Sequence, residues 1–259
     1  KDADYFPLSV DYEERYYAAG KIKGSKWVKR EGRPTEDAIL TGRLIDRALR
    51  PRFNHAIRNE VQIVATVLTF DGINDPDIPA LFGASLALMI SDIPFNGPVA
   101  GVRIGKSEGK MVLNPTYQER TISDFDIVIA GPSEKINMIE AGVRIVPEKD
   151  VVSAMQHGFE GLQSLLKIQN EIAKDFKTPK KSLVTKVRDE ALVKIVRDYV
   201  SEKLEKVLYT PHKHEYVEGL RKTQEELTGH ITELFTETGE SAKKLSEAFM
   251  GEKNPWYGK

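Results

Sequence analysis

The residues best suited to bind a ligand lie in one basic segment near the start of the 259-residue chain. Between Lys21 and Arg58 the sequence has 11 Lys and Arg against 4 Asp and Glu, a net charge of +7, while the rest of the chain carries −8. Such a concentration of charge attracts polyanions over roughly 8–10 Å even when the whole molecule is near neutral. Within it, Trp27 lies between Lys26 and Lys29 in a glycine-bounded stretch. The pattern indicates either single-stranded nucleic acid binding, with bases stacked beside cations, or a solvated surface balanced by acids from elsewhere in the fold.

A helix expected at residues 35–50 carries more of these cations. Thr35 follows a proline and precedes two acidic residues, which is an N-cap pattern, and Pro51 ends the helix. The apolar positions on one side are Ala38, Leu40, Leu44, Ile45, Ala48 and Leu49. The arginines on the other side are Arg43, Arg47 and Arg50. The helix is therefore predicted to face a core and an anion at once.

The sequence contains no recognised catalytic signature. It has no phosphate-binding glycine loop, dinucleotide-binding motif, zinc-protease motif or nucleophile elbow. The absence of cysteine excludes disulfides, thiolate metal sites and cysteine nucleophiles, and the five histidines form no ligand pattern. No catalytic and no metal-binding residue is assigned.

Two regions that differ in composition and in their pattern of apolar residues follow the basic segment. The first is predicted to have a buried strand at 61–70, helices at 78–90 and 147–176, and short strands at 99–104, 110–113 and 126–130. This order predicts an α/β (α+β) domain over residues 1–177. The run TPKKS then indicates a linker, and the Lys- and Glu-rich remainder predicts helices at 183–208, 212–236 and 240–250. We expect a small all-helical domain over 178–259.

Composition is that of a globular protein, with 40% hydrophobic and 30% charged residues and a mean hydropathy of −0.39. No apolar run reaches the roughly 18–20 residues that span a bilayer, and no signal peptide is recognisable, so we expect a cytoplasmic protein without membrane contact. The chain begins with Lys1 inside what resembles an element already under way. We therefore expect a fragment.

Three motifs occur in a specific order: GKIKGSKWVKREGRP at 20–34, TGRLIDRALRPRF at 41–53 and GASLALMISDIPFNGP at 83–98. In them the chain resembles the bacterial polynucleotide phosphorylase family, from PLSVDYEERYYAAG through residues 147–176, and the resemblance is weak after about 180. It implies the first of two ribonuclease PH-like cores, lacking its opening strands, followed by the all-α domain.

The resemblance also implies which residues bind RNA. In the family, the segment that ends in REGRP narrows a central pore with aromatic and basic side chains, which here correspond to Trp27, Val28, Lys29 and Arg30. Lys26 makes this loop one residue longer than the commonest form. The residues expected to contact single-stranded RNA are Trp27, Lys29, Arg30, Arg33, Arg43 and Arg47.

Catalysis in the family belongs to the second core, which is absent from this chain. There a serine-rich segment before the GASLAL-type helix binds inorganic phosphate, whereas this chain has Asn74-Asp75-Pro76-Asp77, which should repel it. The second core also spaces metal-binding acids six residues apart, but Gln118 precedes Asp124 here. Asp124 and Asp126 are expected in an exposed turn before a strand. Mg²⁺ is thus implied only for the full enzyme, with ligands outside this chain, and phosphate as its co-substrate.

Two functions remain open. The first is the RNA-guiding, ring-forming part of a 3′-to-5′ phosphorolytic exoribonuclease, inactive alone, whose partners are single-stranded RNA and a homotrimeric ring containing its own second core; no DNA is expected. The second is a stand-alone, non-catalytic RNA-binding scaffold, comparable to the inactive subunits of exosome rings. A second core encoded in the same reading frame would distinguish them.

Overall fold

The computed structural model describes residues 5–22, 24, 32–107, 109–176, 178–183 and 190–238, with side chains up to residue 234. The chain divides into two compact units. We call residues 5–184 the core unit and residues 185–259, with residues 1–4, the helical unit. The division falls seven residues beyond the boundary expected at 177.

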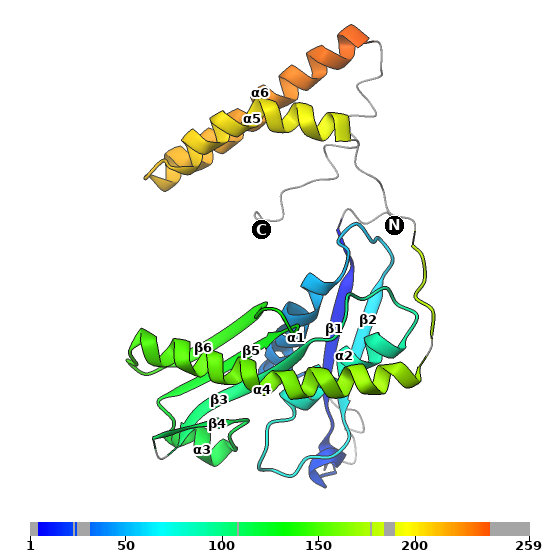
Figure 1. Ribbon diagram of the computed structural model, residues 1–259, viewed down its shortest axis with the longest axis vertical. Coiled ribbons are helices and arrows are strands. Elements are labelled where there is room, and N and C mark those ends of the chain that lie inside the picture. The colour runs from blue at the N-terminus through cyan, green and yellow to red at the C-terminus, as the bar shows by residue number, and fades with distance from the viewer. Residues whose placement is uncertain are drawn as a thin grey trace. The chain divides into compact units, whose positions relative to one another are not determined.

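The core unit contains two sheets and four α-helices within its described residues (Figure 1). Its elements in chain order are β1 (Leu8–Glu14), the 3₁₀ turn η1 (Tyr16–Ala19), α1 (Glu36–Leu49), the 3₁₀ turn η2 (Arg50–Arg52), β2 (Val61–Val67), α2 (Asp77–Ile90), β3 (Ala100–Ser107), β4 (Lys110–Leu113), α3 (Tyr117–Ile122), β5 (Phe125–Gly131), β6 (Met138–Val143) and α4 (Glu148–Asp175). The mixed α/β class predicted from the sequence is confirmed.

The first sheet pairs β1 and β2 in parallel, with Leu8 opposite Val61 and Glu14 opposite Val67. Helix α1 packs on β1 and begins as predicted, because the Thr35 hydroxyl accepts a hydrogen bond from the Ala38 N–H at 3.0 Å. Five of its six expected core positions are buried. The sixth, Leu40, is 57% exposed, so its predicted burial is wrong within this chain.

The second sheet is antiparallel, in the order β4-β3-β5-β6. Helix α4 lies across it (Figure 1) and packs on β3, β4 and β5. The helix approaches closely because it has a glycine at the contact: a Cβ on Gly158 would lie 2.7 Å from Ile104 and 2.9 Å from Ile129. Their side chains join a buried apolar cluster between α4 and the sheet.

Helix α2 is held against the start of β3 by a buried serine. The Ser85 hydroxyl accepts a hydrogen bond from the Val99 N–H at 2.8 Å, and Ser85 is fully buried. This contact gives the serine of the GASLAL motif a structural role.

Replacing Ser85 with Ala should lower the free energy of unfolding by about 1–3 kcal/mol, because the buried Val99 N–H would lose its acceptor. Urea denaturation measures the loss. Ser153→Ala, which removes an exposed hydroxyl from α4, is the matched control and should have little effect. Equal stability of the two variants would contradict the role assigned to Ser85.

Helix α3 and strand β6 of the core unit were not predicted from the sequence. Helix α3 has only six residues and depends on a capping box, in which the Thr116 hydroxyl and the Glu119 carboxylate each accept a backbone N–H. Strand β6 is a single six-residue segment whose side chains are mostly exposed, so it carries no alternating pattern of burial. The expected strand at 61–70 ends at Val67, and only one of its faces is buried.

The segment expected to be a linker is attached to the core unit. The Lys180 ammonium group donates to the carbonyls of Leu88, Met89 and Ser91 at 2.7–3.0 Å. These carbonyls lie at the C-terminal end of α2, where a cation is favoured by the helix dipole. Lys181 adds an ion pair with Asp92 at 2.6 Å.

The described part of the helical unit is a pair of helices, α5 (Glu190–Leu208) and α6 (Lys213–Thr238). Leu227 and Ile231 form its small core, against which Leu192, Val196, Tyr199 and Val200 pack. The third helix expected, at 240–250, lies outside the described residues. None of the helices that the structure describes combines the length and apolarity needed to cross a membrane.

Candidate functional site

A large cleft of about 1990 Å³ opens in the core unit. Its lining comes from the end of β1, the start of α1, the start of α2, and from β5 and β6. Arg33, one of the residues expected to bind RNA, lines this cleft and is exposed.

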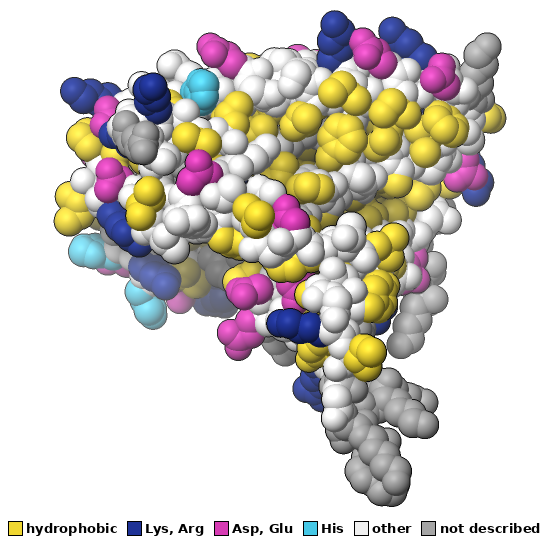
Figure 2. All heavy atoms as spheres, turned by 90° about the horizontal axis from the view of Figure 1, so that it is seen from below, with side chains coloured by type: hydrophobic (Ala, Val, Ile, Leu, Met, Phe, Trp, Pro, Cys, Tyr) yellow, Lys and Arg dark blue, Asp and Glu magenta, His cyan; other side chains and the backbone are white. Residues whose placement is uncertain are grey.

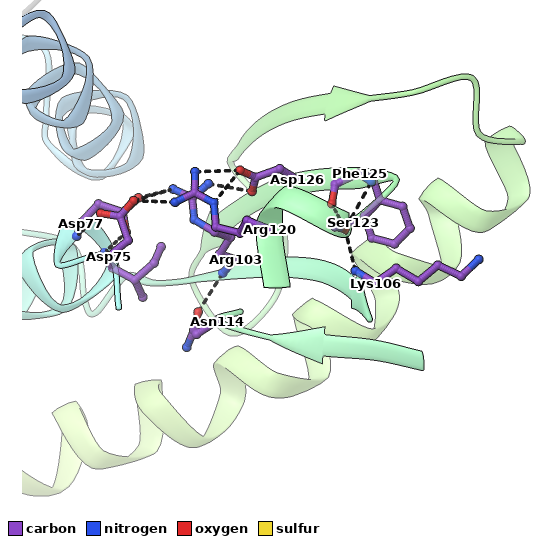
Figure 3. A network of polar contacts seen from close by, with 10 residues as sticks. Asp75, Asp77, Arg103, Lys106, Asn114, Arg120, Ser123, Phe125 and Asp126 are labelled. Carbon is purple, nitrogen blue, oxygen red and sulfur yellow. Dashed lines mark hydrogen bonds and ion pairs between the residues drawn. The ribbon is translucent and has the colours of Figure 1, made fainter. Parts of the chain in front are cut away.

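The start of α2 faces a network of charged side chains within the cleft (Figure 3). Arg103, on β3, is paired with Asp77 and also with Asp126, whose Oδ1 accepts from Arg103 Nη1 at 2.7 Å. Arg120, on α3, bridges Asp75 at 2.8 Å and Asp126 at 2.9 Å. Two guanidinium groups therefore neutralise most of the charge of three carboxylates.

Burial controls the electrostatics of this network. Burial raises the pKa of Asp77, the ion pair with Arg103 opposes that rise, and Asp75 adds to it. Burial by itself lowers the pKa of Arg103, but Asp77 and Asp126 reverse this and hold it above its ordinary value. Next to the network, burial and the charge of Asp75 raise the pKa of Tyr12, which keeps this phenol protonated.

The network bears on whether an anion could bind at the start of α2. Asp77 uses Oδ1 to accept the Ile78 N–H at 2.6 Å, and the Asp77 N–H is directed to Asp75 at 3.2 Å. Carboxylates of the chain itself thus occupy the helix N-terminus, and the nearby arginines are paired with them. The Asp77 and Ile78 N–H groups are therefore already bonded to carboxylates, and the exclusion of phosphate from this helix end stays a prediction.

One expectation for the neighbouring acids is wrong. Asp126 was expected in an exposed turn, but it lies in β5, half-buried, with both carboxylate oxygens bonded to arginines. Asp124 is exposed. Across the described residues no group of three or more His, Asp or Glu side chains is placed to hold a metal ion. Asp75, Asp77 and Asp126 are already paired with guanidinium groups, so this network of the cleft does not fit Mg²⁺.

Sequence reasoning missed Arg103 and Arg120. Neither belongs to a motif, and they meet Asp75 and Asp77 only through the tertiary fold. One signal was present: Arg103 is the only charged residue in the apolar run VAGVRIG. A charge in a buried strand requires a partner, so this arginine could have been expected to form an ion pair.

The residues expected to bind RNA are only partly placed. Trp27, Lys29 and Arg30 lie outside the described residues. Arg43 and Arg47 lie one turn apart on α1, and both are exposed.

The hydrogen bonds of Arg47 and Arg50 show that both side chains already have partners within the chain. Arg47 Nη1 donates to Glu140 at 2.9 Å and Nη2 to the Ile139 carbonyl at 3.0 Å, both on β6. Arg50, which the sequence placed on the side expected to face an anion, instead has a structural role, since it pairs with Asp46 and donates to the carbonyls of Phe6 and Leu8. On the face of the molecule in Figure 2, the coloured Lys and Arg side chains are interspersed with Asp and Glu around exposed hydrophobic groups. This face therefore carries charges of both signs.

Comparison with known proteins defines the class of protein to which this chain belongs. The two models of the 3′ exoribonuclease family, domain 1 and domain 2 of the ribonuclease PH type, match residues 1–94 and 97–161. The chain belongs to this family.

The curated relatives carry one name. The polyribonucleotide nucleotidyltransferase of Heliobacterium modesticaldum is 46% identical over 81% of this chain and 30% of its own length. Those of Gloeobacter violaceus and Enterococcus faecalis are 48% and 41% identical over 79% and 95% of this chain. The chain spans only about a third of the length of such relatives, 29–35%. The predicted resemblance to bacterial polynucleotide phosphorylases is confirmed.

Two further matches complete the comparison. The crystal structure of rice Rrp46 is similar in fold, with a TM-score of 0.52 and 11% identity over 67% of this chain and 75% of that one. A third family model, the NUMOD3 motif, matches residues 235–259. This stretch lies within the region that the sequence assigned to the all-helical domain.

Proposed function

We propose that this chain is the RNA-guiding, ring-forming part of a 3′-to-5′ phosphorolytic exoribonuclease whose catalytic core lies elsewhere. One observation carries the proposal. In a chain 41–48% identical to polyribonucleotide nucleotidyltransferases, the start of α2, where a phosphate would bind, is filled by Asp75 and Asp77 in ion pairs with Arg103 and Arg120.

The reaction of the parent enzyme defines what this chain must do. An oxygen of inorganic phosphate attacks the phosphorus that links the last two nucleotides. The bond from that phosphorus to the 3′ oxygen of the penultimate nucleotide breaks, so a nucleoside diphosphate leaves and the shortened RNA ends in a 3′ hydroxyl. A divalent ion such as Mg²⁺ would stabilise the phosphoryl charge in the other core. The present chain would hold the RNA without reading its sequence.

The proposed RNA contacts use two kinds of side chain. Trp27 offers a stacking surface for any base, and Lys29, Arg30, Arg33 and Arg43 offer charge to phosphates. Arg47 would have to exchange its bond with Glu140 for one with a phosphate. We further propose that the parent enzyme is a homotrimeric ring in the cytoplasm.

The double variant Lys29→Ala/Arg30→Ala should bind single-stranded RNA more weakly and with a flatter salt dependence. Each lost phosphate contact removes about 0.7 from the slope of log K against log salt, so two contacts should remove about 1.4. Fluorescence anisotropy with a labelled oligoadenylate between low and moderate salt measures this slope. An unchanged slope would place the two residues away from the RNA.

Phosphate-dependent release of nucleoside diphosphates from poly(A) tests the proposed function. The chain alone should release none, and adding the separately expressed second core of a relative should restore release. The second core alone, with the same amount of a protein that does not bind RNA, is the control. Activity of the chain alone would overturn the assignment of Asp75 and Asp77 as residues that exclude phosphate.

The alternative is a stand-alone, non-catalytic RNA-binding scaffold. It shares the RNA contacts and the filled α2 N-terminus, so binding measurements do not separate it from the first proposal. It predicts that no second core is encoded in the same reading frame. It also predicts that the second core of a relative gains no activity from this chain.

A further inference from the structure

The cleft of the core unit has aromatic residues at one end that the proposed function does not use. Tyr17 lies in η1, Phe70 follows β2 and Tyr117 begins α3, and all three line the cleft. Backbone hydrogen bonds join the three segments. The Phe70 N–H donates to the Ala18 carbonyl at 2.9 Å, and the Tyr117 N–H donates to the Ile73 carbonyl at 3.0 Å. Segments far apart in the sequence thus bring aromatic residues to one part of the cleft.

The ring of Tyr117 is held by its neighbours and is still accessible. Phe70 contacts it with the ring centroids 6.2 Å apart and the planes at 77°, and Arg120 lies over it with Cζ 5.5 Å from the centroid. Tyr117 nevertheless remains 38% exposed, and Tyr17 is 57% exposed. A ring that is already held in place loses little conformational freedom when a flat ligand stacks on it.

A buried hydroxyl group lies close to this ring. Tyr12, on β1, lines the cleft and is 4% exposed, and its hydroxyl has no hydrogen-bond partner among the described residues. Burial, the charge of Asp75 and, to a smaller extent, Tyr117 raise the pKa of Tyr12, so the phenol keeps its proton. Burying a hydroxyl without a partner costs free energy, and such groups are normally satisfied. Tyr12 therefore offers a donor to a ligand that stacks on Tyr117.

The interior of the cleft favours the uncharged part of a ligand. Arg103 and Arg120 are paired with Asp75, Asp77 and Asp126, so neither guanidinium group lacks a carboxylate. A phosphate would have to displace one of these carboxylates. A nucleobase is flat, carries no charge and has hydrogen-bonding edges, so it matches stacking rings beside a hydroxyl donor.

The cleft also has cations for the phosphates attached to such a base. Lys21 and Arg33 line the cleft and are exposed, and neither side chain forms an ion pair within the described part of the chain. Lys21 precedes and Arg33 follows the stretch that contains Trp27, Lys29 and Arg30. RNA bound by that stretch would therefore have the cleft next to it.

We propose that this cleft holds bases of single-stranded RNA, which stack on Tyr17 and Tyr117 and accept a hydrogen bond from the Tyr12 hydroxyl. Lys21 and Arg33 contact the neighbouring phosphates. The inference rests on the proposed RNA-binding role and adds three tyrosines to the residues that the sequence indicated.

Fluorescence anisotropy with a labelled oligoadenylate over a salt series tests the site. Tyr117→Ala and Tyr17→Ala should each weaken binding about five- to hundredfold, the usual effect of removing a stacking ring. The slope of log K against log salt should not change, because no phosphate contact is lost. Tyr117→Phe keeps the ring and should bind like the parent. Tyr209→Ala, at an 82% exposed tyrosine of the helical unit, is the matched control and should have no effect.

An abasic oligomer of the same length separates stacking from an effect on folding. It has the phosphates but no bases, so the parent and Tyr117→Ala should bind it equally. Tyr12→Phe removes only a hydroxyl and should weaken the binding of oligoadenylate about two- to tenfold, again without an effect on the abasic oligomer. Equal losses on both oligomers, a flatter salt slope, or tyrosine variants that bind oligoadenylate like the parent would each overturn the proposal.

The same measurements separate this inference from the proposed function. If Lys29→Ala/Arg30→Ala flattens the salt slope while the three tyrosine variants bind like the parent, the base site is wrong and the proposed RNA-binding role stands. If the parent chain binds no oligoadenylate at any salt concentration, both are wrong.

Discussion

Replacing Arg103 with Met should lower the free energy of unfolding by about 3–5 kcal/mol, since removing one partner of a buried ion pair leaves the other charge uncompensated. Arg103 is 9% exposed and Asp77 is 2% exposed, and Arg103 also bonds Asp126. The measurement is urea denaturation with the slope compared between variants. Arg144→Met, at an exposed arginine that lines the same cleft, should change stability little.

The loss of stability in the Arg103→Met variant should depend on pH. Burial already raises the pKa of Asp77, and Arg103 opposes the rise, so its removal should raise this pKa further. The folded variant then retains a proton that the unfolded chain releases, and its stability falls as the pH rises above the ordinary carboxyl pKa. The deficit should therefore be smaller at about pH 4 than at about pH 7. Asp77→Asn in the Arg103→Met background should recover part of the loss at neutral pH, and a deficit independent of pH would contradict this account.

Replacing Gly131 with Ala should destabilise the core unit by about 1–3 kcal/mol, the usual range for overpacking a tight contact. An added Cβ would overlap the carbonyl oxygen of Lys135 and lie 3.0 Å from the Ile136 Cα. Both are backbone atoms of the turn that leads into β6, so no side chain can rotate away. Thermal and urea denaturation measure the loss.

Gly83→Ala is the contrasting substitution for the same measurement. Gly83 lies inside α2, and a Cβ there would meet open space. Alanine in a helix interior is favoured over glycine by about 0.5–1 kcal/mol, so this variant should be more stable than the parent. If both substitutions changed the free energy of unfolding in the same direction, backbone crowding at Gly131 would not be the cause of its effect.

The sequence alone determined the elements whose signals are local. Thr35 caps α1 as expected, because an N-cap acts on an N–H three residues away. Helices α2 and α4 and strands β3 and β5 lie where the apolar periodicity placed them. The three motifs, by their residues and their order along the chain, are specific enough to identify the family. The RNA-binding assignment of Trp27, Lys29, Arg30, Arg33, Arg43 and Arg47 stays a prediction.

Tertiary structure decided what depends on residues far apart in the chain. Arg103 and Asp77 are 26 positions apart, and Arg120 and Asp75 are 45 apart, so no local pattern could show that these charges neutralise one another. The same holds for Asp126, which β5 carries into the network, and for Leu40, which helical periodicity placed in a core that does not cover it. Periodicity reports which side of an element is apolar. Whether a neighbour covers that side, and which charges meet across the fold, is set by how the sheets and helices pack.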